Sequence, residues 1–404
     1  MKLNQNDLKK FCLVYAADAP EMDQIALSLK TLLKEKLGVA IDCLSDAYIS
    51  DREYEILLGC TKRAFSRACY TEGGVAPMTY RVILKGTKLQ IACGGAASAT
   101  AFLKALEQLI AEGAMPEEVD EGTYMETELT GLSVVPLTAG STLRVMTSNV
   151  LTHCWEGGRG YPSVAHRAEM YAATLNIYQP NLIGIQETDL PWIDYLPYYF
   201  EALRVYSGGR LDYACLGNCY VMPDGAQIPC YTSLIYRKDR FDVLESGIEA
   251  YPYAVKEWKL KCRTCTWGIY RDRTDGEVYG VFNTHWSFTA EETEISIRIG
   301  LETVRDKQSK YPGLHVFCTG DFNNHLNKSI EKFSERSGFG DSKDEAKKNG
   351  SLINENPGIP EGIYIDHIFF NEGVTVTRHE TIDARYTQKM SDHMLQYGDF
   401  LILK

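Results

Sequence analysis

The chain has 404 residues, of which 45% are hydrophobic, so it is long enough for two domains and can bury at least one sizeable core. Its 42 Lys and Arg against 54 Asp and Glu give a formal net charge of −12, which disfavours a general affinity for the nucleic-acid backbone. No run approaches the roughly 18 apolar residues that span a bilayer. The apolar run after the basic start is at the minimum length for a secretory signal, and charges follow it directly. We therefore expect a soluble, cytoplasmic protein without a membrane span.

Residues 1–115 predict a small α/β domain. Residues 20–38 place apolar side chains at helical spacing and end at Gly38, and a second helix is expected over 96–111. Strand patterns alternate with these helices at 11–16, 39–44, 54–60, 79–86 and 88–95.

Residues 116–142 are expected to form a linker. The hydrophobic periodicity fades there, and acidic, Gly and Pro residues dominate. Few contacts are then expected between the two parts, so that the chain from about Gly140 onward should fold by itself.

Residues 143–404 predict a domain made mostly of strands. Several runs are apolar at consecutive positions, as in sheets that are covered on both faces. Helices are expected between some of them, around 164–178 and 292–309. This pattern favours a four-layered α/β sandwich of two packed mixed sheets over a purely parallel fold.

The 12 cysteines are scattered, and most lie within apolar strand-like runs, as Cys43, Cys93 and Cys318 do. The closer spacings at 215–219 and 262–265 lack the second ligand pair that a zinc site needs. We expect buried or incidental thiols here and neither a zinc site nor disulfides.

Polar residues recur where the predicted strands of the second part end. Side chains at strand ends gather over one rim of a sheet. Carboxylates, amides and imidazoles, without an activated Ser or Cys, suit a hard cation such as Mg²⁺ or Mn²⁺ together with a water nucleophile. Any one of these motifs is also explained as a turn. The strand-end groups are Ser148-Asn149, Gln186-Glu187, Thr284-His285-Trp286, Gly320-Asp321-Phe322-Asn323, Asp366-His367 and Ser391-Asp392-His393.

Taken in order, the motifs TSNVL, IGIQETD, LIYRKDRF, FNTHW, TGDFNNH, IDHIFF and SDHML resemble the metal-dependent endonuclease/exonuclease/phosphatase superfamily over residues 143–404. The resemblance implies a metal-dependent phosphoesterase with Mg²⁺ or Mn²⁺ as cofactor. It implies that Glu187 is the principal metal ligand and that Asn149 supports the metal or a phosphate oxygen. Asp392 would lie beside the metal.

The same resemblance implies the catalytic roles. Asp321 would orient or deprotonate the attacking water, and Asn323 would donate to the phosphoryl oxygens. His285 and His393 would flank the phosphate, with Asp366 orienting the imidazole of His393. Such a set neutralises the charge that develops in an in-line displacement and needs no covalent intermediate.

The expected substrate is a phosphodiester or phosphomonoester of a small molecule or lipid headgroup. The alternatives are a DNA or RNA nuclease of the same superfamily and a non-catalytic binding relative. Residues 141–404 contain 28 Lys and Arg against 35 Asp and Glu, which disfavours nucleic acid. Chemically competent residues at all of the family's positions disfavour the non-catalytic alternative.

Further candidates lie around these motifs. The glycines of WEGGRGYPSVAHR can let backbone amides approach a phosphate, with Arg159 beside them as a substrate-binding residue, although a surface loop explains the segment equally well. Arg167 and Arg298 are expected in structural ion pairs, and His153 at the periphery. The aromatic residues of 190–200 and 251–261 are expected to pack in the core.

The N-terminal part carries a second resemblance. Residues 54–95 and the helix after them resemble the small accessory α/β domain that precedes the catalytic domains of some glycoside hydrolases. Since this part has no clustered acids or metal ligands, a binding, positioning or dimerising role is implied.

Overall fold

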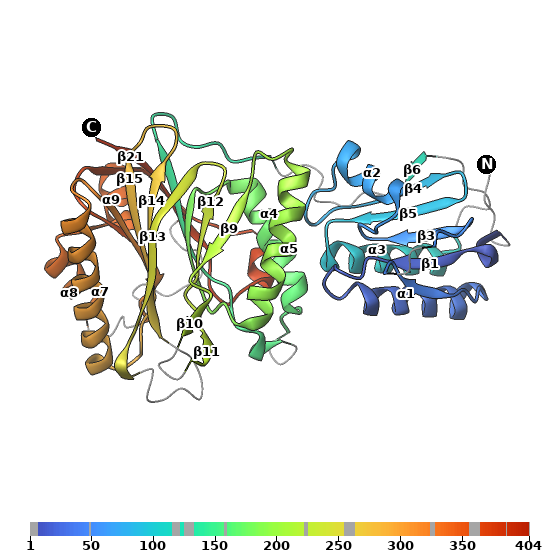
Figure 1. Ribbon diagram of the computed structural model, residues 1–404, viewed down its shortest axis with the longest axis horizontal. Helices are drawn as coiled ribbons and strands as arrows, with labels where there is room; N and C mark the ends of the chain where they lie inside the picture. Colours follow the sequence, from blue (N-terminus) through green and yellow to red (C-terminus); the bar gives the residue numbers. More distant parts are fainter. Residues whose placement is uncertain are drawn as a thin grey trace. The chain divides into compact units, whose positions relative to one another are not determined.

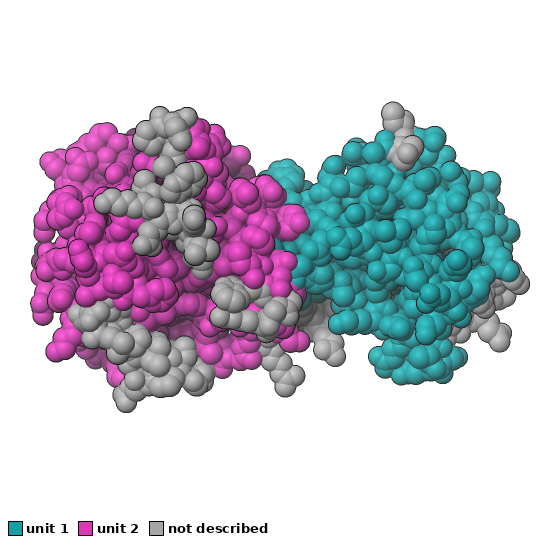
Figure 2. All heavy atoms as spheres, turned by 90° about the horizontal axis from the view of Figure 1, so that it is seen from below, with its two compact units in different colours: residues 1–134, 163–177, 198–211 teal, residues 135–162, 178–197, 212–404 magenta. Residues whose placement is uncertain are grey.

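The computed structural model describes residues 7–47, 50–114, 122–124, 133–156, 160–221, 225–253, 263–323, 328–354, 364–384 and 386–403. Contacts divide the chain into two compact units (Figure 2). Unit 1 comprises residues 1–134, 163–177 and 198–211, and unit 2 comprises 135–162, 178–197 and 212–404. The chain therefore returns twice to the first unit after the expected linker. The domain boundaries at 115 and 143 stay a prediction.

Unit 1 is built on a six-stranded sheet with the order β2-β1-β3-β5-β4-β6 (Figure 1). Its elements are β1 (Cys12–Tyr15), α1 (Met22–Leu37), β2 (Cys43–Ser45), β3 (Glu55–Leu58), α2 (Ala64–Gly73), β4 (Tyr80–Lys85), β5 (Lys88–Cys93), α3 (Ala96–Ala111) and β6 (Gly122–Tyr124), after a 3-10 turn at Asp7–Lys10. The expected helices α1 and α3 and the five expected strands are confirmed. Strand β6 pairs with β4, so part of the expected linker belongs to this sheet.

A carboxylate from helix α4 (Val164–Tyr178) closes the N-terminus of α3 within unit 1. Glu169 Oε2 accepts hydrogen bonds from the backbone N–H groups of Ala97 (2.7 Å) and Ser98 (3.1 Å), and Oε1 accepts from Ser98 Oγ and Met78 N, both at 2.7 Å. The side chain is fully buried. Burial raises the pKa of this carboxyl group, and the four hydrogen bonds oppose that shift. The contact satisfies backbone donors that a helix start leaves without partners.

Two glycines make room for this carboxylate. A Cβ atom at Gly94 would lie 3.0 Å from Glu169 Oε1, and one at Gly95 would lie 2.7 Å from Oε2 and 2.5 Å from the ring of Tyr199. A fragment that begins at Gly140 would contain Glu169 but not its hydrogen-bond partners Met78, Ala97 and Ser98. An isolated fragment of this kind would therefore expose a surface that is buried in the full chain.

Unit 2 is a sandwich of two mixed sheets (Figure 1). The seven-stranded sheet has the order β18-β20-β21-β7-β8-β12-β9, and the six-stranded sheet has the order β13-β14-β15-β16-β19-β17. The strands of the first are β7 (Leu143–Asn149), β8 (Leu182–Gln186), β9 (Tyr213–Leu216), β12 (Leu234–Arg237), β18 (Leu352–Ile353), β20 (Val374–Thr381) and β21 (Gln396–Ile402). Those of the second are β13 (Phe241–Ala250), β14 (Thr264–Asp272), β15 (Val278–His285), β16 (His315–Asp321), β17 (Gly340–Asp341) and β19 (Asp366–Phe370). A separate hairpin joins β10 (Cys219–Val221) and β11 (Gln227–Pro229).

The apolar inner faces of the two sheets form one core. Leu143 and Val145 of the first sheet pack in the same cluster as Val281 and Phe317 of the second. Helices α7 (Ala290–Lys310) and α8 (Ser329–Ser337) cover the other face of the six-stranded sheet through a second core, and α9 (Ser342–Asn349) contributes to the first. The expected α/β sandwich and the helices expected around 164–178 and 292–309 are confirmed.

Helix α5 (Leu190–Tyr206) was not expected from the sequence. The aromatic residues of this helix obscure its helical period, and Pro197 lies in its interior. Pro191 occupies the first turn, where a proline costs no hydrogen bond. Trp192 is fully buried and donates from Nε1 to the carbonyl oxygen of Leu151 at 3.0 Å. The expectation of core packing for this tryptophan is confirmed.

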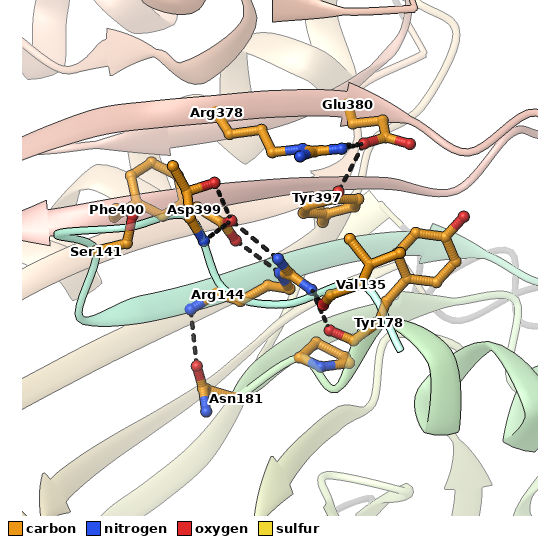
Figure 3. A network of polar contacts seen from close by, with 12 residues as sticks. Val135, Ser141, Arg144, Tyr178, Asn181, Arg378, Glu380, Tyr397, Asp399 and Phe400 are labelled. Atoms are coloured by element: carbon orange, nitrogen blue, oxygen red, sulfur yellow. Dashed lines mark hydrogen bonds and ion pairs between the residues drawn. The ribbon is translucent and has the colours of Figure 1, made fainter. Parts of the chain in front are cut away.

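A buried ion pair joins strands β7 and β21 of unit 2 (Figure 3). Arg144 Nε lies 2.6 Å from Asp399 Oδ1, and Nη2 lies 2.9 Å from Oδ2. The guanidinium group also donates to the carbonyl oxygens of Val135 and Pro136 at 2.9 Å and lies 4.4 Å from the centre of the Tyr397 ring. Hydrogen bonds from the Arg144 side chain to these two backbone carbonyls therefore hold the end of the expected linker on unit 2.

Within the described ranges, no helix combines the length and the apolar character needed to cross a membrane. The cytoplasmic location stays a prediction. Every cysteine that the structure describes is a free thiol, and Cys93, Cys265 and Cys318 are buried as expected, whereas Cys43 is half-buried. Cys262 lies outside the described residues.

Glu169 should contribute strongly to the stability of unit 1. We expect Glu169→Ala to lower the free energy of unfolding by about 3 kcal/mol or more, because it leaves several buried donors without an acceptor. Urea unfolding of the full chain measures the change. The matched control is Glu201→Ala, since Glu201 is 59% exposed and paired with Arg204, and its loss should cost less than about 1 kcal/mol. Equal losses in the two variants would contradict the role of Glu169.

Candidate active site

The strand register brings the predicted polar groups to one rim of unit 2. In the six-stranded sheet His285 is paired with Asp321, and Asp321 is paired with Asp366. In the seven-stranded sheet Asn149 is paired with Gln186, directly before Glu187. Asn149, His285 and Asp321 end their strands as expected, whereas Asp366 begins β19, which runs antiparallel to β16, so that these residues meet at the same rim.

Asn283 connects the two sheets below this rim. Its Nδ2 atom donates two hydrogen bonds of 2.9 Å, and its Oδ1 atom accepts bonds of 2.6 and 3.2 Å. The partners are the carbonyl oxygens of Ile185 and Ser233, Gln186 Nε2 and Thr319 Oγ1. Because Asn283 is fully buried and fully hydrogen-bonded, it holds the two sheets in one relative position.

The carboxylate of Asp321 is the centre of the cluster. Its Oδ2 atom accepts a hydrogen bond from Asn149 Nδ2 at 3.0 Å and lies 3.3 Å from His285 Nε2 and 3.7 Å from His393 Nε2. Its Oδ1 atom accepts the backbone N–H of Asn323 at 3.0 Å. Burial raises the pKa of Asp321 to about 6, although the charge of His393 opposes the shift. This carboxyl group is therefore easier to protonate than an exposed one.

His393 is oriented by Asp366. The Nδ1 atom of the imidazole lies 2.8 Å from Asp366 Oδ2, which leaves Nε2 facing Asp321. Ser391 fixes the backbone before β21, since its hydroxyl donates to the carbonyl oxygen of Asn149 and accepts the N–H of His393. Burial lowers the pKa of His393, but Asp366 and Asp321 outweigh that effect and raise it to about 10. The two carboxylates therefore favour the protonated form of the imidazole.

Glu187 leaves β8 in a left-handed backbone conformation, with φ of 65°. Such a conformation costs a non-glycine residue roughly 1 kcal/mol. The side chain is held by the N–H of Thr152, which donates to Oε2 at 2.9 Å, and by Asn149 Nδ2, which lies 3.3 Å from Oε1. These contacts direct the carboxylate into the rim.

The donor set fits a divalent cation of the Mg²⁺ or Mn²⁺ type. Oxygen atoms of Asp321 and Asp366 lie within 4.8 Å of each other and of a ring nitrogen of His393. Because a protonated imidazole offers no lone pair, the carboxylates are the candidate ligands of this group. Asn149 joins this cluster to Glu187 through its side-chain amide. Asp366 Oδ1 is buried and has no hydrogen-bond partner among the described residues, and a hard cation would satisfy such an oxygen.

The other predicted residues have different surroundings. Asn323, with φ of 52°, donates from Nδ2 to the carbonyl oxygen of Trp286 at 2.8 Å, so its amide group is already oriented by the backbone. Asp392 is exposed and helps to raise the pKa of the adjacent His393. Arg159 lies outside the described residues. The roles of these three residues, like those of the other predicted site residues, stay predictions.

Two side chains near the site were not predicted. Asp189 Oδ2 accepts from Thr152 Oγ1 and from the backbone N–H of His153 at 2.7 Å, and it lies 2.6 Å from His153 Nδ1. The buried Asp189 therefore orders the segment of Thr152 and His153, whose Thr152 N–H contacts Glu187. The second is Arg263, whose Nη1 atom donates to the carbonyl oxygen of Trp286. The sequence showed it only as the end of the short basic run KLKCR.

Comparisons with known proteins support the fold. No protein-family model matches this chain, and no curated protein does. Solved structures do: a mannosyl-6-phosphatase of Bacteroides thetaiotaomicron is similar, with 19% identity, a TM-score of 0.52, and 65% of this chain and 100% of that chain covered. An endonuclease/exonuclease/phosphatase family protein of the same organism is similar at 20% identity, a TM-score of 0.52, and 65% and 95% coverage. One from Bacteroides vulgatus is similar at 21% identity, a TM-score of 0.51, and 64% and 98% coverage. The resemblance to this superfamily is thus confirmed for the fold.

A divalent cation should stabilise the folded chain. Millimolar Mg²⁺ or Mn²⁺ should raise the melting temperature, because a ligand that binds only the folded state stabilises it by mass action. Glu187→Gln should raise the metal concentration for half-maximal stabilisation by about tenfold or more. Asp392→Asn, a matched change at an exposed predicted ligand, should raise it less. Differential scanning fluorimetry measures the melting temperature of each variant against metal concentration. Equal changes in the two variants, or no stabilisation of the unaltered chain by either ion, would argue against Glu187 as the principal metal ligand.

Proposed function

We propose that unit 2 is a metal-dependent phosphoesterase that hydrolyses the phosphate ester of a small molecule or lipid headgroup. The observation that carries the proposal is the convergence of Asn149, His285 and His393 on the Asp321 carboxylate, which Asn149 also links to the carboxylate of Glu187. The fold shared with a bacterial phosphatase supports it. A divalent metal held by Glu187 and Asn149 would neutralise negative charge on the phosphate oxygens.

The chain's own residues divide the remaining work between proton transfer and charge stabilisation. A water oxygen bonds to phosphorus while the ester P–O bond breaks. Asp321 accepts the proton that the water loses, and the departing alkoxide takes up a proton from solvent to leave as the alcohol. The cationic His393 and the neighbouring His285 donate hydrogen bonds to phosphate oxygens as their charge grows. Asp366 holds the imidazole of His393 in the orientation that directs Nε2 to the site.

The finer proposals concern the substrate and the cofactor. The mannosyl-6-phosphatase among the similar structures favours a sugar phosphomonoester. The net charge of −12 disfavours a nucleic-acid polymer, because it repels the phosphate backbone. Mg²⁺ or Mn²⁺ is the expected ion, since the site lacks the cluster of soft ligands that other metals prefer within the described residues.

A substrate panel tests this function. The full chain should hydrolyse at least one phosphomonoester or phosphodiester with Mg²⁺ or Mn²⁺, EDTA should abolish the activity, and either ion should restore it. DNA and RNA in the same panel test the nuclease alternative. Full activity after exhaustive chelation would refute the metal requirement, and preferred hydrolysis of nucleic acid would favour the alternative.

A double-mutant cycle tests the pair of Asp366 and His393. We expect His393→Ala and Asp321→Asn each to lower kcat by on the order of a hundredfold or more, with smaller changes in KM. Asp366→Asn should resemble the loss of His393. The double variant of Asp366 and His393 should be little worse than His393→Ala alone, because residues that act as a unit are not additive. Additive losses would show that the two side chains act separately.

A further inference from the structure

Arg263 lies at the rim of the site, and the proposed reaction assigns it no role. The residue directly precedes β14, and its Nη1 atom donates to the carbonyl oxygen of Trp286. The same oxygen accepts the side-chain N–H of Asn323 at 2.8 Å. Trp286 follows His285, and its backbone N–H donates to the carbonyl oxygen of Asp321 at 2.9 Å. The guanidinium group is therefore separated from the candidate catalytic residues by a single carbonyl group.

Arg263 has no carboxylate partner within ion-pair distance in the ranges that the structure describes. Its side chain is half-buried, and burial lowers its pKa, while the nearby charge of Asp321 favours the cation. Two other buried or half-buried arginines of unit 2 do have carboxylate partners, since Arg144 pairs with Asp399 and Arg240 with Asp272. Partial burial removes some of the water that hydrates a guanidinium cation, which costs free energy. An anion beside the guanidinium group offsets this cost. The site therefore favours a negatively charged group next to Arg263.

Phe288 continues this surface outward. Its ring is 71% exposed, whereas Trp286 two residues earlier is 1% exposed. The guanidinium carbon of Arg263 lies 5.3 Å from the centre of the Phe288 ring, which is the geometry of a cation–π contact. An aromatic ring that is fixed by a cation and otherwise largely exposed offers a surface on which another ring can stack.

We propose that Arg263 and Phe288 form the substrate-recognition site of unit 2: Arg263 binds the non-bridging oxygens of the phosphate, and Phe288 stacks against a ring of the leaving group. This inference rests on the proposed phosphoesterase function. The planar guanidinium can donate two parallel hydrogen bonds to a phosphate, which a lysine cannot. The leaving group is then a sugar or a nucleoside, and an acyclic alcohol lacks the contact with Phe288.

The phosphate contact is tested without turnover. Inorganic phosphate is titrated calorimetrically into the full chain in the presence of Mg²⁺, with the unaltered chain, Arg263→Gln and Arg263→Lys. Arg263→Gln should raise the Kd for phosphate about tenfold or more, and Arg263→Lys should restore only part of the affinity. The control is Arg298→Gln, which removes a positive charge from an exposed pair with Glu302 and should leave the Kd unchanged.

The ring contact is tested with three phosphomonoesters: hexose 6-phosphate, nucleoside 5′-monophosphate and glycerol phosphate. Phe288→Ala should raise KM severalfold for at least one ring-bearing ester and leave glycerol phosphate unchanged. Phe288→Tyr should retain the unaltered KM. A response to the hexose ester alone identifies a sugar, and a response to the nucleotide alone identifies a nucleobase.

The outcomes separate this inference from the function on which it rests. If the unaltered chain hydrolyses no ester, the proposed function fails, whereas phosphate binding still tests Arg263. If the unaltered chain is active but Arg263→Gln keeps its phosphate affinity, the inference fails and the proposed function stands. Equal changes of KM for all three esters in Phe288→Ala, or no change for any of them, overturn the stacking role.

Discussion

The candidate site depends on how closely the two sheets of unit 2 approach each other. The sheets approach each other closely at Gly184, where a Cβ atom would lie 1.9 Å from Thr319 Oγ1 and 2.5 Å from Asn283 Oδ1. Only a residue without a side chain fits between the sheets there, and Asn283 occupies the space with an amide whose hydrogen bonds reach both sheets. Asn149 comes from one sheet and Asp321 from the other, so their 3.0 Å contact exists only while this spacing is kept.

Buried polar groups hold the rest of the molecule in a similar way. Arg144 and Asp399 join β7 to β21. Strand β7 ends at Asn149, and β21 begins shortly after His393. Each of these groups would destabilise the fold if it were left without partners, but with its hydrogen bonds satisfied it specifies one arrangement of the strands. The apolar cores drive the packing of the sandwich, and the polar contacts select the register in which the strand ends meet.

Much of this arrangement could be predicted from the sequence, because it follows from local patterns. Helix α3 begins and ends where its apolar spacing does. His285 and Asp321 end strands of the expected pattern, Glu187 directly follows one, and Asp366 begins one. The parts that could not be predicted depend on tertiary contacts. Helix α5 contains prolines and aromatic residues that obscure its period, and nothing in the run KLKCR shows that its last residue reaches Trp286. Asp189 was missed because its partners, Thr152 and His153, lie more than thirty residues earlier in the chain.

The turn between β5 and α3 has the glycine-rich sequence that phosphate groups often select at the start of a helix. In this protein the carboxylate of Glu169 already accepts the hydrogen bonds of that turn. An acceptor tethered in the same chain acts at a high effective concentration, against which a dissolved anion competes poorly. The backbone N–H groups of this turn thus already have an acceptor from the same chain. The phosphate of a nucleotide would have to displace the Glu169 carboxylate to bind there.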